Sequence, residues 1–495
     1  MRVLLASSEV YPYSKTGGLA DMVAALAKSL AGAGAQVGVV TPLYRGIRDR
    51  FPEMQKLDWR MDLPLGSRRV TAEIYQRKLG ARLTFYFLDQ PGFYDRPELY
   101  QQNNQDYPDN PERFIFFAKA VAHMARYLPW RPEVVHAHDW QAGLAPLLIR
   151  HQQKWEGWGT APRTILTIHN LAYQGNCPRP CYSLTNLPWD YFNSEGVEFY
   201  GQVNLLKAAI EYADQLTTVS PGYAREILTP ALGAGLDGVL KRRQAVLTGI
   251  LNGVDYAEWN TTRNPFLKHH FSVENLAGKA AEKLDLQREL GLTVSPAIPI
   301  YGNIGRLVEQ KGIDILMGSL EEMLPSKMQL VVLGSGLPQY EHAFQDLARR
   351  YPQQVAVRVG FDNGLPHRIK AGCDYYLMPS RYEPCGLNQL YGLRYGAVPV
   401  VRATGGLNDT VIDIREDLDQ ANGIKFNEYS TAALSKSIRK SLVLFREPDL
   451  LLHLRQNGMR ANFSWKETSL QYLEIYRRAR RSPTERAEGA LPPTP

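Results

Sequence analysis

The first half of the chain alternates short apolar runs with segments of helical periodicity. Residues 3–6 form an apolar run that predicts a buried strand, and residues 37–41 form a second one. Between them, apolar side chains recur every three or four residues from Leu19 to Leu30, which predicts a helix. A strand, a helix and a strand in succession make a βαβ unit with parallel strands. Similar runs at 134–136 and 164–168 extend the pattern, so we expect a doubly wound α/β domain.

A second α/β series begins near residue 298. Helical patterns at 313–323 and 387–395 separate its apolar runs. Two Rossmann-like domains are therefore expected, with a ligand in a deep cleft where the carboxyl ends of their strands face each other. The predicted strands of this series are residues 298–304, 329–333, 355–359, 374–378 and 397–401.

The predicted domain boundaries follow from these two series. The first domain is expected to span residues 1–248 and the second residues 249–455. Residues 456–480 are expected to form a helix that returns to the first domain. Residues 481–495 contain Pro, Glu, Arg and Gly without apolar periodicity, which predicts a flexible tail.

Composition excludes several classes of protein. Apolar residues make up 44% and charged residues 22% of the chain, so disordered, collagen-like and coiled-coil classes are disfavoured. Fifty-seven Lys and Arg against 50 Asp and Glu leave a charge of +7, which fits an anionic small molecule as easily as nucleic acid. The first residues carry too short an apolar run for a signal peptide, and no stretch approaches the ~20 apolar residues of a membrane span. With only four cysteines, a cytoplasmic protein is expected.

Metal and cofactor signals are weak. Cys177 and Cys181 have the spacing C-x3-C, but no second Cys or His pair follows, and the pair His136 and His138 lacks a matching third ligand. The segment closest to a dinucleotide fingerprint, residues 334–339, lacks the third glycine and contains a proline, and no P-loop pattern occurs. We therefore expect neither a metal nor a bound cofactor.

A glycine-containing loop follows the first predicted strand. Lys15 stands beside Gly17 and Gly18 where a helix begins, and free backbone amides, the helix dipole and a lysine together favour an anion. A flexible turn with a solvated lysine explains the same residues equally well. Asp21 lies in the first helical turn, where a carboxylate stabilises the helix without any functional role.

Two loops of the second half carry charged side chains after predicted strands. Arg306 and Lys311 follow the strand at 298–304, and such cations can bind a phosphate or stabilise a departing diphosphate. Ordinary surface charges at a helix entry are the alternative. Glu383, in the irregular sequence E-P-C-G, is placed where a carboxylate could reach a sugar, and the amides of the following turn could hold a phosphate.

Polar and aromatic side chains also gather in two loops of the first half. His138, Asp139 and Trp140 follow one strand, and His169 with Tyr173 follows the next. Hydrogen-bonding groups beside flat apolar faces suit a hexose. For His136, a histidine satisfied within the core is the simpler explanation.

These loops belong to seven ordered motifs that resemble those of the bacterial glycogen synthases and plant starch synthases. The likeness runs from residue 1 to about residue 478, and it implies a GT-B fold with an acceptor-side first domain and a nucleotide-binding second domain. The motifs are K-T-G-G-L-A-D at 15–21, H-A-H-D-W at 136–140, T-I-H-N-L-A-Y-Q-G at 167–175, G-I-L-N-G-V-D at 249–255, G-R-L-V-E-Q-K-G at 305–312, E-P-C-G-L-N-Q-L-Y-G at 383–392 and T-G-G-L-N-D-T-V at 404–411.

The resemblance implies roles for individual residues. Arg306 and Lys311 would hold the diphosphate, His169 would contact the glucosyl unit, and Glu383 would bind the sugar hydroxyls; these four would be the catalytic residues. Phe361 would lie against the adenine. The substrate-binding residues so implied are Lys15, Gly17, Gly18, Asp21, His138, Asp139, Asn252, Asp255, Phe361, Cys385, Gly386 and Leu387.

The implied reaction is transfer of glucose from ADP-glucose, with retention of configuration, to the non-reducing end of an α-1,4-glucan such as glycogen, starch or a maltooligosaccharide. No nucleic acid or membrane partner is expected. The second glutamate of the wider E-x7-E motif is replaced by Tyr391, as is frequent in these synthases, and this leaves the ribose contact unassigned. A UDP-glucose enzyme and a glucan-binding protein without activity are the alternatives. The Lys15, His169, Arg306, Lys311 and Glu383 set argues against the second.

Overall fold

The structure, a computed structural model, describes residues 1–103, 105–360 and 362–481. The chain divides into two compact units. The first comprises Met1–Val219, Ala224–Gly253 and the chain from Trp465, and the second comprises Ser220–Tyr223 and Val254–Ser464. Residues 249–253, expected in the second domain, lie in the first unit because the strand β14 (Leu247–Gly249) pairs with β13 (Gln215–Thr218) there.

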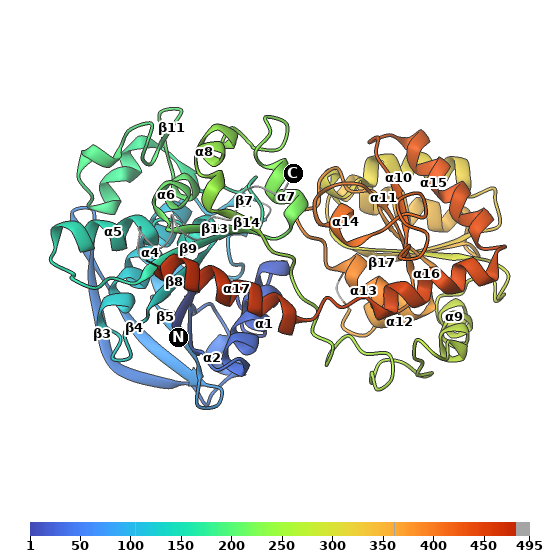
Figure 1. Cartoon of the computed structure of the whole chain (residues 1–495), viewed down its shortest axis with the longest axis horizontal. Helices are drawn as coiled ribbons and strands as arrows, with labels where there is room; N and C mark the ends of the chain where they lie inside the picture. The colour runs from blue at the N-terminus through green and yellow to red at the C-terminus, as the bar shows by residue number, and fades with distance from the viewer. Residues whose placement is uncertain (104, 361, 482–495) are drawn as a thin grey trace. The chain divides into compact units, whose positions relative to one another are not determined.

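A nine-stranded sheet forms the centre of the first unit (Figure 1). Seven neighbouring strands are parallel, and four of them contain the predicted apolar runs at 3–6, 37–41, 134–136 and 164–168. Their order is β14, β13, β9 (Arg163–Ile168), β8 (Val134–His138), β1 (Arg2–Ala6), β2 (Gln36–Pro42) and β5 (Leu83–Asp89). The helices of this unit are α1 (Gly18–Gly32), α2 (Ile47–Arg50), α3 (Pro91–Tyr94), α4 (Asn110–Tyr127), α5 (Ala145–Trp155), α6 (Leu205–Tyr212), α8 (Asp237–Arg242) and α17 (Trp465–Arg480), while α7 (Pro221–Glu226) crosses the unit boundary.

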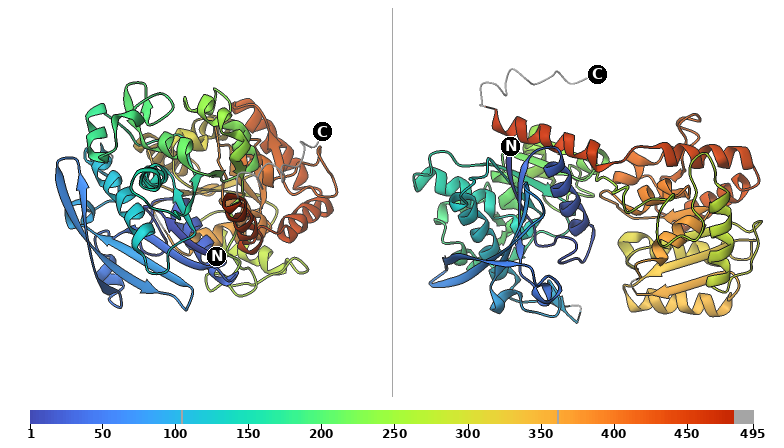
Figure 2. Two further views of the ribbon diagram at one scale, coloured as in Figure 1. Left: turned by 60° about the vertical axis from the view of Figure 1, so that its left-hand side comes forward. Right: turned by 90° about the horizontal axis from the view of Figure 1, so that it is seen from below.

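Two long strands extend this sheet in a way that the sequence pattern did not predict. β4 (Arg68–Lys78) pairs antiparallel with β5, and β3 (Gln55–Leu65) pairs antiparallel with β4. They are the long blue arrows of Figure 2. Along β3, buried Met61, Leu63 and Leu65 alternate with exposed polar or proline positions, as expected for a strand with one face in water. The first unit is therefore a mixed sheet with an antiparallel edge.

The end of the described chain returns to the first unit. The helix α17 packs against α1 and β9, and its Tyr472 and Tyr476 are completely buried. Ser29 on α1 donates a hydrogen bond to the carbonyl of Trp465. The single helix expected at 456–480 is wrong: α16 (Pro448–Arg460) belongs to the second unit, and residues 461–464 form a non-helical link. In that link, the carbonyl of Phe463 accepts the amide of Val254, so its backbone bonds to another segment and not within a helix.

The second unit is a parallel sheet covered on both faces. Its strand order is β17 (Val355–Val359), β16 (Gln329–Gly334), β15 (Ile300–Ile304), β18 (Tyr375–Met378), β19 (Val398–Arg402) and β20 (Ile424–Phe426). Leu330 and Val332 of β16 belong to one apolar cluster, and Val331 and Leu333 belong to another, as alternation along a strand requires. Its helices include α9 (Ala277–Glu289), α10 (Ile313–Met323), α11 (Pro338–Arg350), α12 (Leu365–Gly372), α13 (Asn388–Arg394), α14 (Gly405–Thr410), α15 (Thr431–Leu444) and α16.

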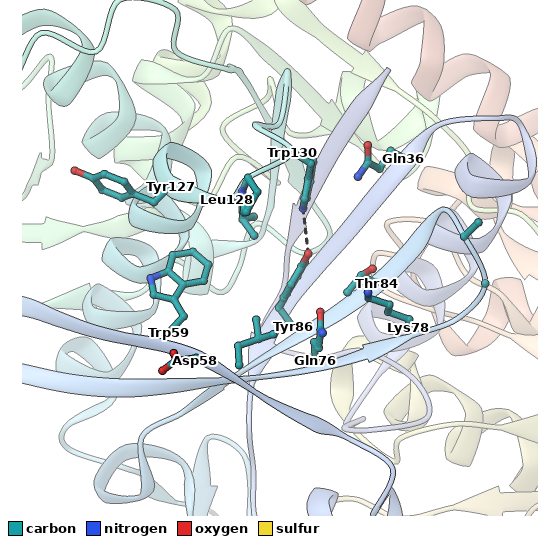
Figure 3. A pocket seen from close by; sticks show the side chains of 14 residues that line it. Gln36, Asp58, Trp59, Gln76, Lys78, Thr84, Tyr86, Tyr127, Leu128 and Trp130 are labelled. Atoms are coloured by element: carbon teal, nitrogen blue, oxygen red, sulfur yellow. Dashed lines mark hydrogen bonds between the residues drawn. The ribbon is translucent and has the colours of Figure 1, made fainter.

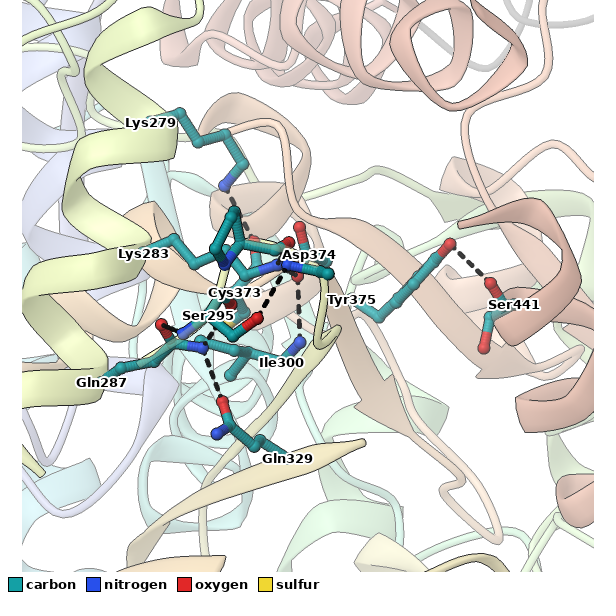
Figure 4. A network of polar contacts seen from close by, with 12 residues as sticks. Lys279, Lys283, Gln287, Ser295, Ile300, Gln329, Cys373, Asp374, Tyr375 and Ser441 are labelled. Atoms are coloured by element: carbon teal, nitrogen blue, oxygen red, sulfur yellow. Dashed lines mark hydrogen bonds and ion pairs between the residues drawn. The ribbon is translucent and has the colours of Figure 1, made fainter. Parts of the chain in front are cut away.

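A buried ion network ties α9 and α16 to this sheet (Figure 4). Asp374, at the start of β18, accepts from Lys283 at 2.7 Å and from Arg455 at 2.6 Å, and its Oδ2 also accepts the amide of Ile300. Lys279 donates to the backbone carbonyls of residues 370, 371 and 373. Burial lowers the pKa of Lys283 even though Asp374 opposes the shift.

Replacing Asp374 with alanine is expected to destabilise the protein strongly. The substitution leaves Lys283 buried without its carboxylate, and breaking a buried ion pair from one side costs about 3–5 kcal/mol. Chemical denaturation read by far-UV circular dichroism measures the loss. The matched control is Asp346→Ala, on the exposed face of α11, and an equal loss in both variants would show that the buried position is unimportant.

Within the described ranges, no helix combines the length and the apolar character that crossing a membrane requires.

Candidate active site

Two candidate residues of the second unit, Lys311 and Glu383, form an ion pair. Lys311 follows β15, Glu383 follows β18, and the ammonium of Lys311 donates to Oε2 of Glu383 at 2.6 Å. Ser380 donates to the same oxygen at 3.1 Å. Glu383 is buried, whereas a quarter of the Lys311 side chain remains exposed. The arrangement presents a fixed carboxylate and a partly free cation at the carboxyl end of a parallel sheet, the usual position of ligand sites in this fold class.

Close backbone packing holds the two loops together. Gly312 has a φ of 72°, and a Cβ there would lie 2.0 Å from the carbonyl oxygen of Pro379. Only glycine allows this approach. Asn388, which the sequence reasoning did not select, donates to the carbonyl of Ile304 at 3.0 Å and so links α13 to the end of β15.

Arg306 lies on the same loop as Lys311 but is exposed. Its guanidinium makes one long contact of 3.4 Å, to Oε1 of Gln310. An exposed guanidinium fork keeps its other donors available for a phosphate.

The residues after Glu383 form a tight turn into α13. Gly386 adopts a φ of 71°, and the side-chain amide of Gln389 donates to the carbonyls of Cys385 and Gly386. Cys385 is buried, and Leu387 is partly exposed. The turn therefore has a fixed backbone. Phe361, expected beside an adenine, lies outside the residues that the structure describes.

In the first unit, the candidate residues follow the carboxyl ends of β1, β8 and β9. Lys15 pairs with Asp21 at 2.8 Å, with its ammonium 5.5 Å from the ring centre of Tyr11. Burial raises the pKa of Asp21, and Lys15 opposes the rise. Gly17 provides no side-chain cap for α1, which begins at Gly18, so the first helical turn keeps donors for a ligand.

Glu9 holds this glycine loop, and the sequence reasoning missed it. Its buried carboxylate accepts from the amides of Thr16 and Gly17, from the hydroxyl of Thr16 at 2.6 Å and from the hydroxyl of Tyr100 at 2.8 Å. The available signal was an acidic residue three positions after the end of a strand and seven positions before Thr16 of the loop. Glu9 thus fixes the loop that carries Lys15.

His138, Asp139 and His169 form one connected group. Nδ1 of His138 lies 3.1 Å from Nε2 of His169, and the amide of His169 donates to Oδ1 of Asp139 at 2.7 Å. Nε2 of His138 is buried without a hydrogen-bond partner in the described part of the chain. Burial lowers the pKa of His169 to about 3, so the imidazole is neutral at physiological pH. Neutral rings can both donate to and accept from sugar hydroxyls.

The backbone at Asp139 is strained. Its φ is 55°, a value that non-glycine residues seldom adopt, and its amide donates to the carbonyl of Thr167. Burial raises the pKa of Asp139 to about 7, although the amides of His169 and Asn170 oppose the shift. Strain combined with a perturbed carboxyl is frequent at functional sites.

His136 serves the core, as the simpler explanation held. Its ring contacts the hydroxyl of Tyr476 on α17 at 2.8 Å and that of Thr167 at 2.6 Å, and the side chain is fully buried. Burial lowers its pKa from 6.5 to about 3. The histidine therefore joins the terminal helix to the sheet in its neutral form.

This burial predicts acid sensitivity. The unfolded chain binds a proton at His136 below pH 6.5 while the folded chain does not, so stability present above pH 6.5 falls as the pH drops toward 3. The expected loss is about 2 kcal/mol between pH 6.5 and 5. Denaturant unfolding of the wild type and of His136→Gln at both pH values measures it. The same pH slope in both proteins would contradict the assignment.

Asn252 and Asp255 show no shared arrangement. Asn252 is buried in the first unit, with its Oδ1 unpartnered among the described residues. Asp255 belongs to the second unit, where its carboxylate accepts the amide of Ala257 at 2.9 Å and closes a turn. Their substrate-binding role stays a prediction.

Over the ranges described, no three His, Cys, Asp or Glu side chains gather as a metal site.

Comparison with known proteins agrees with the motif pattern. Residues 2–242 match the starch synthase catalytic domain, and residues 296–458 match the glycosyl transferases group 1. The chain is 43% identical over 479 residues to a glycogen synthase of Syntrophotalea carbinolica, with 97% of this chain and 99% of that protein covered. A glycogen synthase of Anaeromyxobacter dehalogenans is 45% identical over 478 residues, with coverages of 96% and 99%.

The chain belongs to the glycogen and starch synthase family. It is a glucosyltransferase of this type, as the motifs implied. The catalytic domain of starch synthase IV from Arabidopsis thaliana, solved with ADP and acarbose, superposes with a TM-score of 0.86 at 29% identity, covering 97% of this chain and 99% of that one. The predicted GT-B fold is thereby confirmed. A sucrose-phosphate synthase from Thermosynechococcus elongatus, at 19% identity and a TM-score of 0.60, shares the fold.

Proposed function

We propose that this synthase transfers glucose from ADP-glucose to the 4-hydroxyl at the non-reducing end of an α-1,4-glucan, with retention of configuration. The observation that carries the proposal is the ion pair between Lys311 and Glu383, because it sets a cation and a carboxylate side by side at one strand end. The solved relative, starch synthase IV, was bound to ADP and acarbose. Full-length likeness to glycogen synthases supports the same acceptor class.

The cations act on the leaving group. As the bond between the anomeric carbon and the phosphate oxygen breaks, negative charge grows on the diphosphate. Arg306 and Lys311 then stabilise the transition state more than the ground state. In the first unit, the glycine loop with Lys15, Gly17 and Gly18 offers backbone amides and a cation, which suit a phosphate group.

Glu383 acts on the sugar. The glucosyl unit gains positive charge as the leaving group departs, and a carboxylate fixed by Lys311 and Ser380 stabilises that charge. The neutral histidines His138 and His169 are suited to hydrogen bonds with the hydroxyl groups. Asp139 positions His169 through its backbone amide.

Retention follows from attack on the face that the leaving group vacates. A phosphate oxygen of the departing ADP takes the proton of the acceptor hydroxyl, while the acceptor oxygen bonds to the anomeric carbon. No enzyme carboxylate has to attack the opposite face, as a double displacement would demand. Metal and cofactor play no part in the proposed step.

A cytoplasmic location is also inferred, which the free state of Cys177, Cys181, Cys373 and Cys385 favours.

The experiment is incubation with labelled ADP-glucose and maltotriose, followed by sizing of the products. Longer labelled oligosaccharides are expected. Labelled free glucose alone would mean hydrolysis and would overturn the proposal. A parallel reaction with UDP-glucose distinguishes the donor, and a faster UDP-glucose reaction would replace ADP-glucose in the assignment.

A further inference from the structure

The first unit holds a cavity of about 700 Å³ at the edge of its sheet where the parallel strands begin, opposite the edge that carries the candidate site residues (Figure 3). Its walls come from the starts of β2, β3 and β5, the last residues of β4, and the carboxyl end of α4 with the residues that follow it. The volume falls within the roughly 300–1,000 Å³ of small-molecule sites. We call it the strand-start pocket.

The pocket exists because α4 is shorter than the strands that it covers. Along the inner face of β3, Met61, Leu63 and Leu65 are buried, but Leu57 and Trp59 of the same face are only half-buried. The helix α4 packs against β3 and ends at Tyr127, which is exposed. The helix therefore leaves uncovered the part of the sheet face beside Leu57 and Trp59.

Aromatic rings line this uncovered face in fixed positions. The indole of Trp130 donates to the hydroxyl of Tyr86 at 3.0 Å, as Figure 3 shows. A Cβ on Gly38 would lie 2.7 Å from the Trp130 ring, so the absence of a side chain at this position of β2 makes room for that ring. Across the pocket, Trp59 and Tyr127 flank the imidazole of His123, at ring distances of 5.9 and 4.5 Å.

Polar groups complete the lining, and their charges cancel. Gln76 lies opposite Tyr86, and Lys78 lies opposite Thr84, in the β4–β5 pairing, so these side chains share one face of the sheet. Asp58 and Lys78 are the charged residues of the lining. With one acid and one base, the site has no net charge to select an anion such as a nucleotide.

We propose that the strand-start pocket binds an internal segment of an α-1,4-glucan. Flat aromatic rings offer apolar faces to the C–H faces of glucosyl units, while amides and hydroxyls at the edge hydrogen-bond to the sugar hydroxyls. The choice of glucan rests on the proposed function, since the substrate of that reaction is the neutral, hydroxyl-rich polymer of this chemistry.

The pocket lies apart from the candidate active site of the same unit. Gln36 at the start of β2 lines the pocket, whereas Lys15, Asp139 and His169 follow the opposite, carboxyl ends of the parallel strands. The seven residues of β2 span about 20 Å. A long glucan can occupy both places, and holding it at the pocket raises the local concentration of its chain ends. Maltotriose is too short to gain from the pocket.

The test compares long and short acceptors in Trp59→Ala. The KM for glycogen is expected to rise about three- to tenfold, with kcat and the KM for maltotriose unchanged. The control is Trp155→Ala, an exposed tryptophan at the end of α5 outside the pocket, which should change neither. Unchanged maltotriose kinetics also show that the variant is folded. An equal rise in both KM values, or the same effect in Trp155→Ala, would overturn the proposal.

A direct binding measurement separates this proposal from the proposed function. β-Cyclodextrin is a closed α-1,4-linked ring without a chain end, so it is not elongated. Calorimetry should detect its binding to the wild type and a loss in Trp59→Ala and in Gly38→Ala, where the Trp130 ring is displaced. Equal binding in all three proteins would refute the pocket assignment. Failure of the maltotriose reaction, in contrast, would refute the proposed function alone.

Discussion

Replacing Glu383 with glutamine is expected to lower kcat at least about a hundredfold while leaving the protein folded. The amide has nearly the shape of the carboxylate and can still accept from Lys311 and Ser380, but it cannot stabilise the positive charge that develops on the glucosyl unit. Because the lost interaction belongs to the transition state, kcat should fall more than the KM for ADP-glucose changes. Steady-state kinetics with maltotriose as acceptor measure both parameters.

The matched control for this variant is Glu321→Gln, an exposed glutamate on α10. It makes the same chemical change on the same unit and should leave kcat at the wild-type value. A Glu383→Gln enzyme with undiminished kcat would remove Glu383 from the catalytic residues. Thermal unfolding of each variant distinguishes lost chemistry from a lost fold.

Replacing Lys311 with methionine is expected to lower kcat by about 10²- to 10³-fold. Methionine keeps the apolar stem of the side chain and removes the ammonium that faces the developing charge on the diphosphate. The variant also leaves Glu383 buried without its cation, so a lower unfolding temperature should accompany the loss of activity. Kinetics and thermal unfolding on the same sample test both effects.

Two comparisons make the Lys311 prediction sharper. Lys327→Met changes an exposed lysine of the same unit and should leave kcat and stability unchanged. In the double variant of Lys311 and Glu383, the combined loss should be much smaller than the product of the single losses, because the two side chains are in contact at 2.6 Å. Fully multiplicative losses would show that the two groups act independently.

Much of the second unit could be predicted from apolar runs alone. The strand expected at 355–359 and the helix expected at 313–323 are the observed β17 and α10. Buried parallel strands give continuous apolar runs, which are easy to recognise. The same runs located the loops of Arg306, Lys311 and Glu383, since polar residues directly follow β15 and β18.

Features that depend on contacts between residues far apart in the chain could not be predicted from the sequence. β3 and β4 lie at the sheet edge, and their charged outer faces resemble surface loops. Glu9 is bonded to Tyr100, 91 residues away, and nothing local marks that partner. Lys311 and Glu383 were both selected, but their direct contact joins residues 72 positions apart. The residue roles carried over by resemblance stay predictions until the variants are measured.

The return of α17 to the first unit has a consequence for biosynthesis. Tyr472 and Tyr476 fill the space beside β8 and β9, and His136 bonds to the second of them. On the ribosome, the opening 253 residues emerge long before these tyrosines do. The first unit therefore cannot complete its fold until the second unit has been translated, and the groove that α17 fills stays exposed until then. Nascent chains stalled before residue 465 should be prone to aggregation and chaperone capture, whereas the completed chain should not.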